Sequence, residues 1–219
     1  LPASEFAPEG SSVRVSVLRT RPDPEAVGPP VRIELGPEAA ALVVDVRSRE
    51  VRAMVGGYEE AEGFNRALSA VRQPGSAFKP IVYALGIHSR RFTPASIVVD
   101  APAVYDTWQP RNFETWEHAG PVRLREALAR SINLVAIRVI EDLSPQETVA
   151  FARVLGFTTQ LESSLALALG ASGVRMSELA NAYATVAAGG VWSPLRIIKR
   201  IVGPDGKELP IGGAGEESP

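Results

Sequence analysis

The sequence predicts an α+β fold, because strand patterns near both ends of the chain enclose a stretch of helical patterns. Two apolar segments, 41–46 and 51–55, bracket the four polar residues 47–50, as in a β-hairpin. From residue 76 onward the apolar residues recur at helical spacing instead. The apolar run 42–44 predicts a strand covered on both faces, so we expect the hairpin to lie in a larger sheet backed by helices.

The helices are predicted from apolar spacing and from their end signals. Pro80 falls in the opening turn of the first helix and Pro121 at the start of the second, two positions where proline is tolerated. Ser144-Pro145-Gln146-Glu147 forms a capping box, and Gly156 ends the helix that follows it. The segment 134–143 is apolar nearly all round, which predicts a buried helix. The helices are expected over 76–88, 121–130, 134–143, 145–155 and 176–188.

Short strand patterns occur at both ends of the chain. The segments 13–17 and 31–35 alternate apolar and polar residues within a region rich in Pro, Gly and Ser. This composition predicts a linker, or the remnant of a small β module, over residues 1–35. Near the other end, a Gly-Pro-Asp-Gly turn separates two further strand segments, 191–202 and 207–211, which we expect to pair.

The composition excludes several classes of function. The chain has 23 basic and 25 acidic residues, so it offers no broad positive surface to a nucleic-acid backbone. Its apolar runs are far shorter than the roughly 20 residues that a membrane span needs. His88 and His118 have no partner at metal-ligand spacing, and we therefore expect neither a metal nor a cofactor.

The tetrad Ser76-Ala77-Phe78-Lys79 is the first candidate for chemistry. Residues three apart share a helix face, so the hydroxyl of Ser76 and the amine of Lys79 would be neighbours, as a nucleophile and its base must be. The start of a helix also offers free N–H groups to a developing oxyanion. Partial burial would lower the pKa of Lys79 so that its amine can accept a proton. The alternative is an ordinary helix start.

The second candidate is Ser131-Ile132-Asn133, which lies between two expected helices. Side chains two apart do not share a helix face, so Ser131 and Asn133 can meet at one site only from a turn. From there, a hydroxyl could relay a proton, and an amide could hydrogen-bond both Lys79 and a peptide substrate. Alternatively, Ser131 ends one helix and Asn133 caps the next.

Together, the two motifs match the S-x-x-K and S-x-N signatures of β-lactamases and penicillin-binding proteins, in that order and 55 residues apart. Over about residues 38–210 the chain resembles the transpeptidase domain of bifunctional, class A penicillin-binding proteins. The segments that carry the resemblance are Phe64-Asn65-Arg66-Ala67, Arg72 to Pro80, Leu124 to Ser131, Leu167-Ala168-Leu169-Gly170 and Glu178 to Thr185.

This resemblance implies the fold shared with serine β-lactamases, a helical cluster with an antiparallel sheet. It implies a D,D-transpeptidase that crosslinks peptidoglycan stem peptides ending in D-Ala-D-Ala and is acylated by β-lactams. Ser76 would then be the acylated nucleophile and Lys79 its base. Ser131 would pass the proton to the leaving D-alanine, and Asn133 would bind the substrate backbone. The implied location is the cell envelope, on the periplasmic or extracytoplasmic face of the inner membrane, with an upstream membrane anchor that this chain lacks.

The third motif of that family, K-T-G, does not occur, since neither Lys199 nor Lys207 is followed by threonine. We therefore expect the fold to be incomplete, with residues 36–219 forming a transpeptidase domain truncated before this motif. Because the motif brings an oxyanion donor, we expect the chain alone to be nearly inactive. A D,D-carboxypeptidase or β-lactamase-type hydrolase on the same fold, and a non-catalytic cell-wall scaffold, are the alternatives.

The loop before Pro121 holds the remaining polar and aromatic candidates. Trp108, Phe113 and Trp116 are expected to pack locally, with a minor contact to substrate as the alternative. The carboxylates of the 100–106 region, Asp100 and Asp106, are expected to be solvated loop charges.

Overall fold

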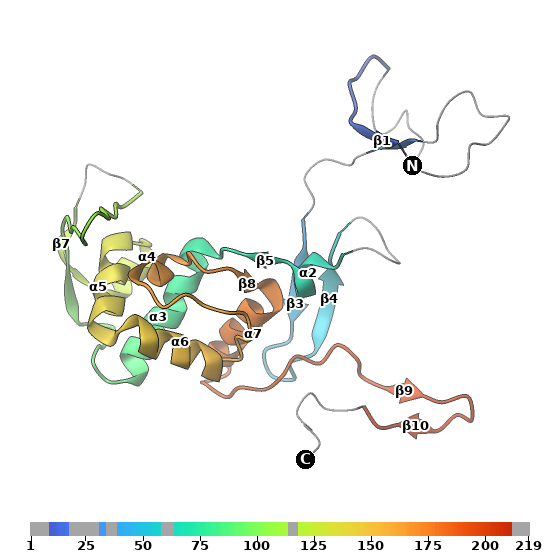
Figure 1. Cartoon of the computed structure of the whole chain (residues 1–219). Coiled ribbons are helices and arrows are strands. Elements are labelled where there is room, and N and C mark those ends of the chain that lie inside the picture. Colours follow the sequence, from blue (N-terminus) through green and yellow to red (C-terminus); the bar gives the residue numbers. More distant parts are fainter. Residues whose placement is uncertain (1–8, 18–30, 34–38, 58–63, 114–117, 212–219) are drawn as a thin grey trace. The chain divides into compact units, whose positions relative to one another are not determined.

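The computed structural model describes residues 9–17, 31–33, 39–57, 64–113 and 118–211. The chain divides into two compact units, and the smaller one contains β1 (Val15–Val17) and β2 (Val31–Ile33). These strands pair antiparallel and confirm the two strands expected near the start of the chain (Figure 1). The end of the second expected strand, residues 34 and 35, lies outside the described residues. All later elements belong to the larger unit.

The predicted hairpin is present as β3 (Ala41–Val44) and β4 (Val51–Val55), which pair antiparallel. The expectation of a larger sheet is wrong for the described part of the chain, where this ladder has only these two strands. α7 (Met176–Ala187) packs against β3, whose side chains alternate between half-buried and exposed, and Val43 is 54% exposed. One face of β3 is therefore exposed, so its apolar run does not mark a strand buried on both faces.

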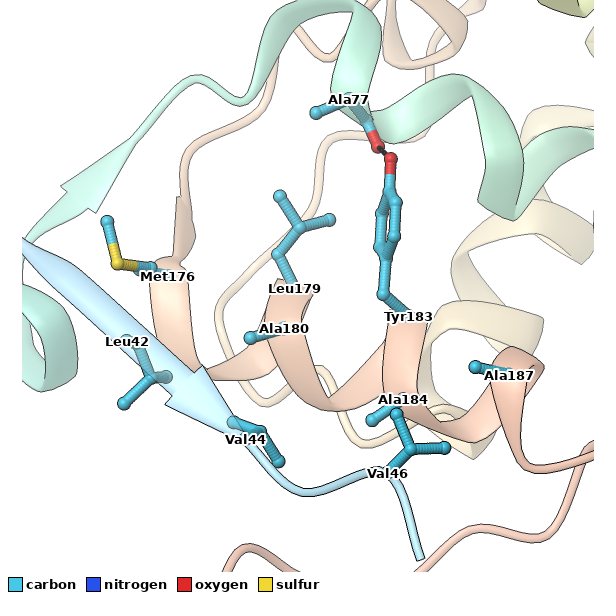
Figure 2. A pocket seen from close by; sticks show the side chains of 10 residues that line it. All are labelled: Leu42, Val44, Val46, Ala77, Met176, Leu179, Ala180, Tyr183, Ala184 and Ala187. Atoms are coloured by element: carbon cyan, nitrogen blue, oxygen red, sulfur yellow. Dashed lines mark hydrogen bonds between the residues drawn. The ribbon is translucent and has the colours of Figure 1, made fainter. Parts of the chain in front are cut away.

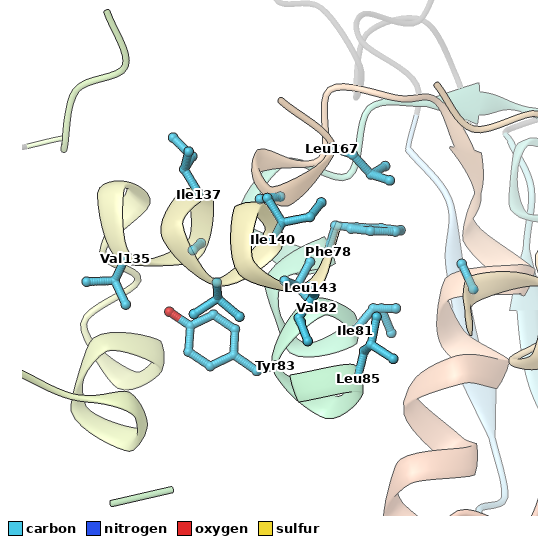
Figure 3. Close-up of a cluster of buried hydrophobic side chains, with 14 of the residues drawn as sticks. Phe78, Ile81, Val82, Tyr83, Leu85, Val135, Ile137, Ile140, Leu143 and Leu167 are labelled. Carbon is cyan, nitrogen blue, oxygen red and sulfur yellow. The ribbon is translucent and has the colours of Figure 1, made fainter. Parts of the chain in front are cut away.

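α5 (Asn133–Leu143) is the buried helix that its sequence predicts, with seven of its eleven residues buried. It contacts α3 (Lys79–His88), α6 (Pro145–Val154) and the 3-10 helix η2 (Leu165–Leu169). Each large aliphatic side chain buried there contributes about 2 kcal/mol. Figure 3 shows the central cluster, formed by Phe78, Ile81, Val82, Tyr83, Leu85, Val135, Ile137, Ile140, Leu143 and Leu167. Within the described ranges, no helix is long and apolar enough to cross a membrane.

The helix expected over 121–130 is shorter than predicted. Residues Gly120–Arg123 form β7, which pairs antiparallel with β6 (Ile97–Asp100), and only Leu124–Ala129 form a helix, α4. Pro121 lies in the ladder opposite Val99. Proline is tolerated in an edge strand, where its missing N–H costs no ladder bond, so strand pairing here outweighs the preference of proline for a helix start.

The helix ends follow the predicted signals. The hydroxyl of Ser144 accepts a hydrogen bond from the backbone N–H of Glu147 (3.2 Å) and caps α6. Gly156, with φ +93°, follows the end of α6, and Gly189 (φ +74°) and Gly190 (φ +91°) follow the end of α7. Left-handed backbone of this kind is the usual way to end a helix.

The strand expected over 191–202 is present only at its end. There β9 (Ile201–Val202) pairs antiparallel with β10 (Glu208–Leu209). Before β9, Arg196 forms an isolated parallel bridge with Glu50, with backbone bonds from Val51 N–H to the Arg196 oxygen (3.0 Å) and from Arg196 N–H to the Arg49 oxygen (2.9 Å). Trp192 lies against the end of α6: a Cβ on Gly156 would lie 2.5 Å from Nε1 of its indole.

Short elements connect the hairpin to the helices. α2 (Arg66–Ser69) is capped by Asn65, whose Oδ1 accepts from the N–H of Ala67 (3.0 Å). β5 (Val71–Arg72) pairs antiparallel with β8 (Val174–Arg175). This pairing brings the segment before the 3-10 turn η1 (Gly75–Phe78) next to the start of α7.

Glu178, in the first turn of α7, is an anchor that the sequence pattern does not predict. Its side chain is 9% exposed and accepts hydrogen bonds from the backbone N–H groups of Thr158, Thr159 and Arg175. Burial raises the pKa of Glu178, but these bonds and those from the two threonine hydroxyls outweigh it and lower the pKa to about 2. The charged carboxylate therefore ties α7 to the loop after α6.

Candidate active site

Ser76 lies on η1 (Gly75–Phe78), a 3-10 turn that runs directly into α3. The helix predicted from Ser76 therefore begins as a tighter turn, and regular α geometry starts at Lys79, with Pro80 in the opening turn as predicted. The side chain of Ser76 is exposed, while those of Phe78 and Lys79 are buried. Ser76 thus lies three residues before α3, on the turn that leads into its N-terminal end.

Lys79 is 1% exposed, and its amine is the point where two other candidate residues meet. Nζ donates to the backbone oxygen of Ser131 (2.6 Å), to Oγ of Ser131 (3.0 Å) and to Oδ1 of Asn133 (2.6 Å). Burial lowers the pKa of Lys79 to about 8. The structure therefore brings Lys79, Ser131 and Asn133 together, whereas the hydroxyl of Ser76 makes no hydrogen bond to this amine.

Ser131 reaches Lys79 because of the way α4 ends. Its backbone is left-handed (φ +55°), the N–H of Ser131 donates to Leu128 (3.0 Å), and the N–H of Ile132 donates to Ala127 (2.9 Å). These two bonds define a Schellman motif, in which glycine is the usual residue at the left-handed position. With serine there, the turn directs both the carbonyl and the hydroxyl of one residue at the amine of Lys79.

Asn133 is the first residue of α5, and the residue at the capping position is Ile132. The cap role considered for Asn133 is therefore wrong. Its Nδ2 donates to the carbonyl oxygen of Arg111 (2.9 Å), and its Oδ1 accepts from Lys79. Since a carbonyl only accepts and Lys79 donates, both neighbours assign the same orientation to the amide.

Asn112 and Asp100 belong to the same network, although no sequence pattern predicts a role for Asn112 and Asp100 is expected to be a solvated loop charge. Oδ1 of Asn112 accepts from the N–H groups of Asn133 (3.0 Å) and Leu134 (3.2 Å), and its Nδ2 donates to Oδ1 of Asp100 (2.9 Å). Asp100 is 2% exposed, so the expectation of a solvated charge is wrong for it, while Asp106 is exposed as expected. No local pattern signals a cap that is supplied from 21 residues away.

The aromatic and histidine side chains near the site have mostly structural neighbours. Trp108 packs against Tyr105, with ring centroids 6.0 Å apart, as expected. Phe113 is 98% exposed, so local packing is the wrong expectation for it, and Trp116 lies outside the described residues. The ring of His88 lies 5.6 Å from that of Phe151. Among the residues described, no three His, Cys, Asp or Glu side chains form a group that could hold a metal ion.

Two neighbours contact the backbone of η1. The hydroxyl of Tyr183, on α7, donates to the carbonyl oxygen of Ala77 (2.8 Å). A Cβ added to Gly170, at the end of η2, would lie 2.2 Å from the carbonyl oxygen of Gly75, so the two backbones are in direct contact. Figure 2 shows an apolar pocket of about 540 Å³ beside Tyr183, lined by Leu42, Val44, Val46, Ala77, Met176, Leu179, Ala180, Tyr183, Ala184 and Ala187.

Comparison with known proteins identifies this arrangement. The family model described as the penicillin-binding protein transpeptidase domain matches residues 39–213. Penicillin-binding protein 1A of Pseudomonas aeruginosa is 37% identical over 180 residues, which cover 78% of this chain and 22% of that protein. The same-named protein of Neisseria meningitidis serogroup A is 35% identical over 179 residues, with the same coverage of both chains.

Solved structures of penicillin-binding proteins have the same fold. The crystal structure of penicillin-binding protein 1A from Haemophilus influenzae superimposes with a TM-score of 0.72 at 35% identity, covering 83% of this chain and 28% of that one. PonA1 from Mycobacterium tuberculosis, in complex with penicillin V, gives a TM-score of 0.71 at 28% identity over 78% of this chain and 49% of that one. The chain belongs to the penicillin-binding protein transpeptidase family, of the class A, penicillin-binding protein 1A type. It spans about a fifth of the length of its matched 1A relatives.

Proposed function

We propose that the protein is a D,D-transpeptidase that crosslinks peptidoglycan stem peptides ending in D-Ala-D-Ala through an acyl-enzyme on Ser76. The observation that carries the proposal is that Ser131 and Asn133 both bind the buried amine of Lys79. Lys79 directly follows the turn that holds Ser76. The activity is proposed for the full-length protein, because the 219 residues contain two of the three family motifs. Its place is the outer face of the inner membrane, and β-lactams acylate the same serine.

In the first step, Oγ of Ser76 attacks the carbonyl carbon between the two D-alanines and gives its proton to Nζ of Lys79. The backbone N–H of Ser76 is one donor to the oxyanion that forms. The amide bond then breaks, and the departing D-alanine amine takes up a proton through the hydroxyl of Ser131. In the second step, the amine of another stem attacks the ester, a new peptide bond forms, and Oγ of Ser76 regains its proton.

The contacts of Lys79 suit this proton transfer. A neutral amine has two N–H donors and one lone pair. The backbone oxygen of Ser131 and Oδ1 of Asn133, each 2.6 Å from Nζ, can only accept, and together they take up the two donors. The third contact, to Oγ of Ser131 at 3.0 Å, is the one that the neutral amine gives up, so that its lone pair can accept the proton of Ser76; the ammonium that forms then donates to this hydroxyl, which passes its own proton to the leaving amine.

The proposal is tested by treating the full-length protein with a labelled penicillin and measuring intact mass and peptide masses. We expect one penicilloyl adduct per chain, on Ser76, with slow release. Ser76→Ala should carry none, and the exposed Ser163→Ala is the matched control that should label like the wild type. Absence of a wild-type adduct would refute the acyl-enzyme, and rapid turnover of the penicillin would identify a hydrolase instead.

Two substitutions of Ser131 separate its hydroxyl from its backbone conformation. Ser131→Ala and Ser131→Gly both remove the hydroxyl, and we expect both to slow acylation by roughly 100-fold. Glycine fits the left-handed backbone (φ +55°), so the free energy of unfolding of the glycine variant should be about 1 kcal/mol higher than that of the alanine variant. Stopped-flow acylation and urea unfolding measure the two effects. Different acylation rates in the two variants would show that backbone geometry, not the hydroxyl, controls the step.

A further inference from the structure

The first turn of α5 is capped from a distant loop. Its capping residue, Ile132, has no side chain that can accept a hydrogen bond. The oxygen Oδ1 of Asn112 fills this role by accepting from the N–H groups of Asn133 (3.0 Å) and Leu134 (3.2 Å). Free N–H groups at a helix start need such a partner, so Asn112 determines where the first residue of α5 lies.

The same loop also holds the side chain of Asn133. The carbonyl oxygen of Arg111 accepts from Nδ2 of Asn133 (2.9 Å). Arg111 directly precedes Asn112, which binds the backbone N–H of Asn133. Two consecutive residues therefore fix both the backbone and the amide of Asn133. The remaining amide atom, Oδ1, is left facing Lys79 at 2.6 Å.

Asp100 determines the orientation of Asn112. Its carboxylate, 2% exposed at the end of β6, accepts from Nδ2 of Asn112 (2.9 Å) and from the N–H of Ala119 (2.8 Å), and Nδ1 of His118 lies 3.7 Å away. A carboxylate only accepts, so the amide of Asn112 must turn Nδ2 toward Asp100 and Oδ1 toward α5. The β6–β7 ladder thereby anchors the loop.

We propose that Asn112, oriented by Asp100, is a positioning residue for acylation: it places Asn133 so that the Asn133 amide holds the amine of Lys79. This proposal rests on the proposed function, since it assigns a role in the reaction of Ser76. Asn112 acts through Asn133 and is not assigned a contact with substrate. Its loss should lower the rate of the acylation step rather than the initial binding of the β-lactam.

The test uses a charge swap in the full-length protein. In Asn112→Asp, two carboxylates face each other, and we expect the acylation rate constant to fall roughly 10- to 100-fold with little change in the dissociation constant of the initial complex. In the double variant Asp100→Asn with Asn112→Asp, the new amide donates to the new carboxylate, while both groups keep their backbone N–H donors. We expect this variant to recover most of the wild-type rate.

A control variant separates positioning from general stability. Thr148→Val removes a buried hydroxyl that donates to the carbonyl of Ser144 (3.1 Å), away from Lys79. We expect it to unfold at a lower temperature yet acylate at the wild-type rate. An unchanged rate in Asn112→Asp, or no recovery in the double variant, would overturn the positioning role alone. Absence of any wild-type adduct on Ser76 would overturn the proposed function and the positioning role with it.

Discussion

Replacing Lys79 by methionine is expected to slow the acylation of Ser76 in the full-length protein by roughly 10³- to 10⁴-fold, the upper range for loss of a general base. Methionine keeps most of the buried apolar stem and removes only the amine. Three oxygen atoms of Ser131 and Asn133 lose their donor at the same time, so the hydroxyl of Ser131 can no longer exchange a proton there. Stopped-flow labelling with a fluorescent penicillin measures the rate.

The pH profile tests the same role without a substitution. Because burial lowers the pKa of Lys79 to about 8, roughly one amine in ten is neutral at pH 7. The acylation rate should therefore rise about tenfold per pH unit below pH 8 and level off above it. Between about pH 8 and the ordinary lysine value of 10.5, the unfolded chain binds the proton that the folded chain has lost, so the contribution of Lys79 to the free energy of unfolding should rise with pH. The difference between the wild type and Lys79→Met measures this contribution, because the tyrosines with raised pKa values are the same in both.

Lys199→Met is the matched control, because the side chain of Lys199 is 75% exposed and its amine lies 3.6 Å from a carboxylate oxygen of Glu50. Surface ion pairs of this kind contribute little, so we expect wild-type acylation and nearly wild-type stability. Acylation of Lys79→Met within tenfold of the wild type would refute the role of this amine as the base.

Most of the helices could be predicted, because each has a signal in its own residues or in those next to it. The buried helix α5 has a continuous apolar pattern, α6 has its cap at Ser144, and α7 has its terminal pair of glycines, so each could be predicted from neighbouring residues. The meeting of Ser131 and Asn133 could also be predicted, because only a turn lets residues two apart converge.

The parts that were not predicted depend on partners far away in the sequence. Pro121 follows a helix-start rule locally, yet it lies in a strand because residues 97–100 pair with it. The pairing of Asp100 with Asn112, and the capping of α5 by Asn112, cross 12 and 21 residues, and neither leaves a periodic pattern. These contacts orient Asn133. The residues that carry the chemistry, Lys79, Ser131 and Asn133, could therefore be predicted, whereas Asn112 and Asp100, which position them, could not.

Gly170→Ala is expected to damage both folding and acylation. Gly170 has φ +68°, and a Cβ there would lie 2.2 Å from the carbonyl oxygen and 2.6 Å from the nitrogen of Gly75. These are backbone atoms, which no side-chain rotation can move aside. Left-handed strain of about 1–2 kcal/mol and overpacking of about 1–3 kcal/mol together predict a loss of roughly 2–5 kcal/mol in the free energy of unfolding. Displacement of η1 should also slow acylation of Ser76 by roughly 100-fold.

Gly189→Ala introduces the backbone strain without the steric contact, so it separates the two effects. Gly189 has nearly the same backbone angle, φ +74°, but a Cβ there would meet no atom within 4 Å. We expect this variant to lose about 1 kcal/mol, the strain alone, and to acylate at the wild-type rate. Urea unfolding and penicillin labelling of both variants decide the matter. If the two variants lose the same stability and acylate at the same rate, η1 tolerates the displacement. If only Gly170→Ala acylates slowly, the end of η2 holds Ser76 in its reactive position.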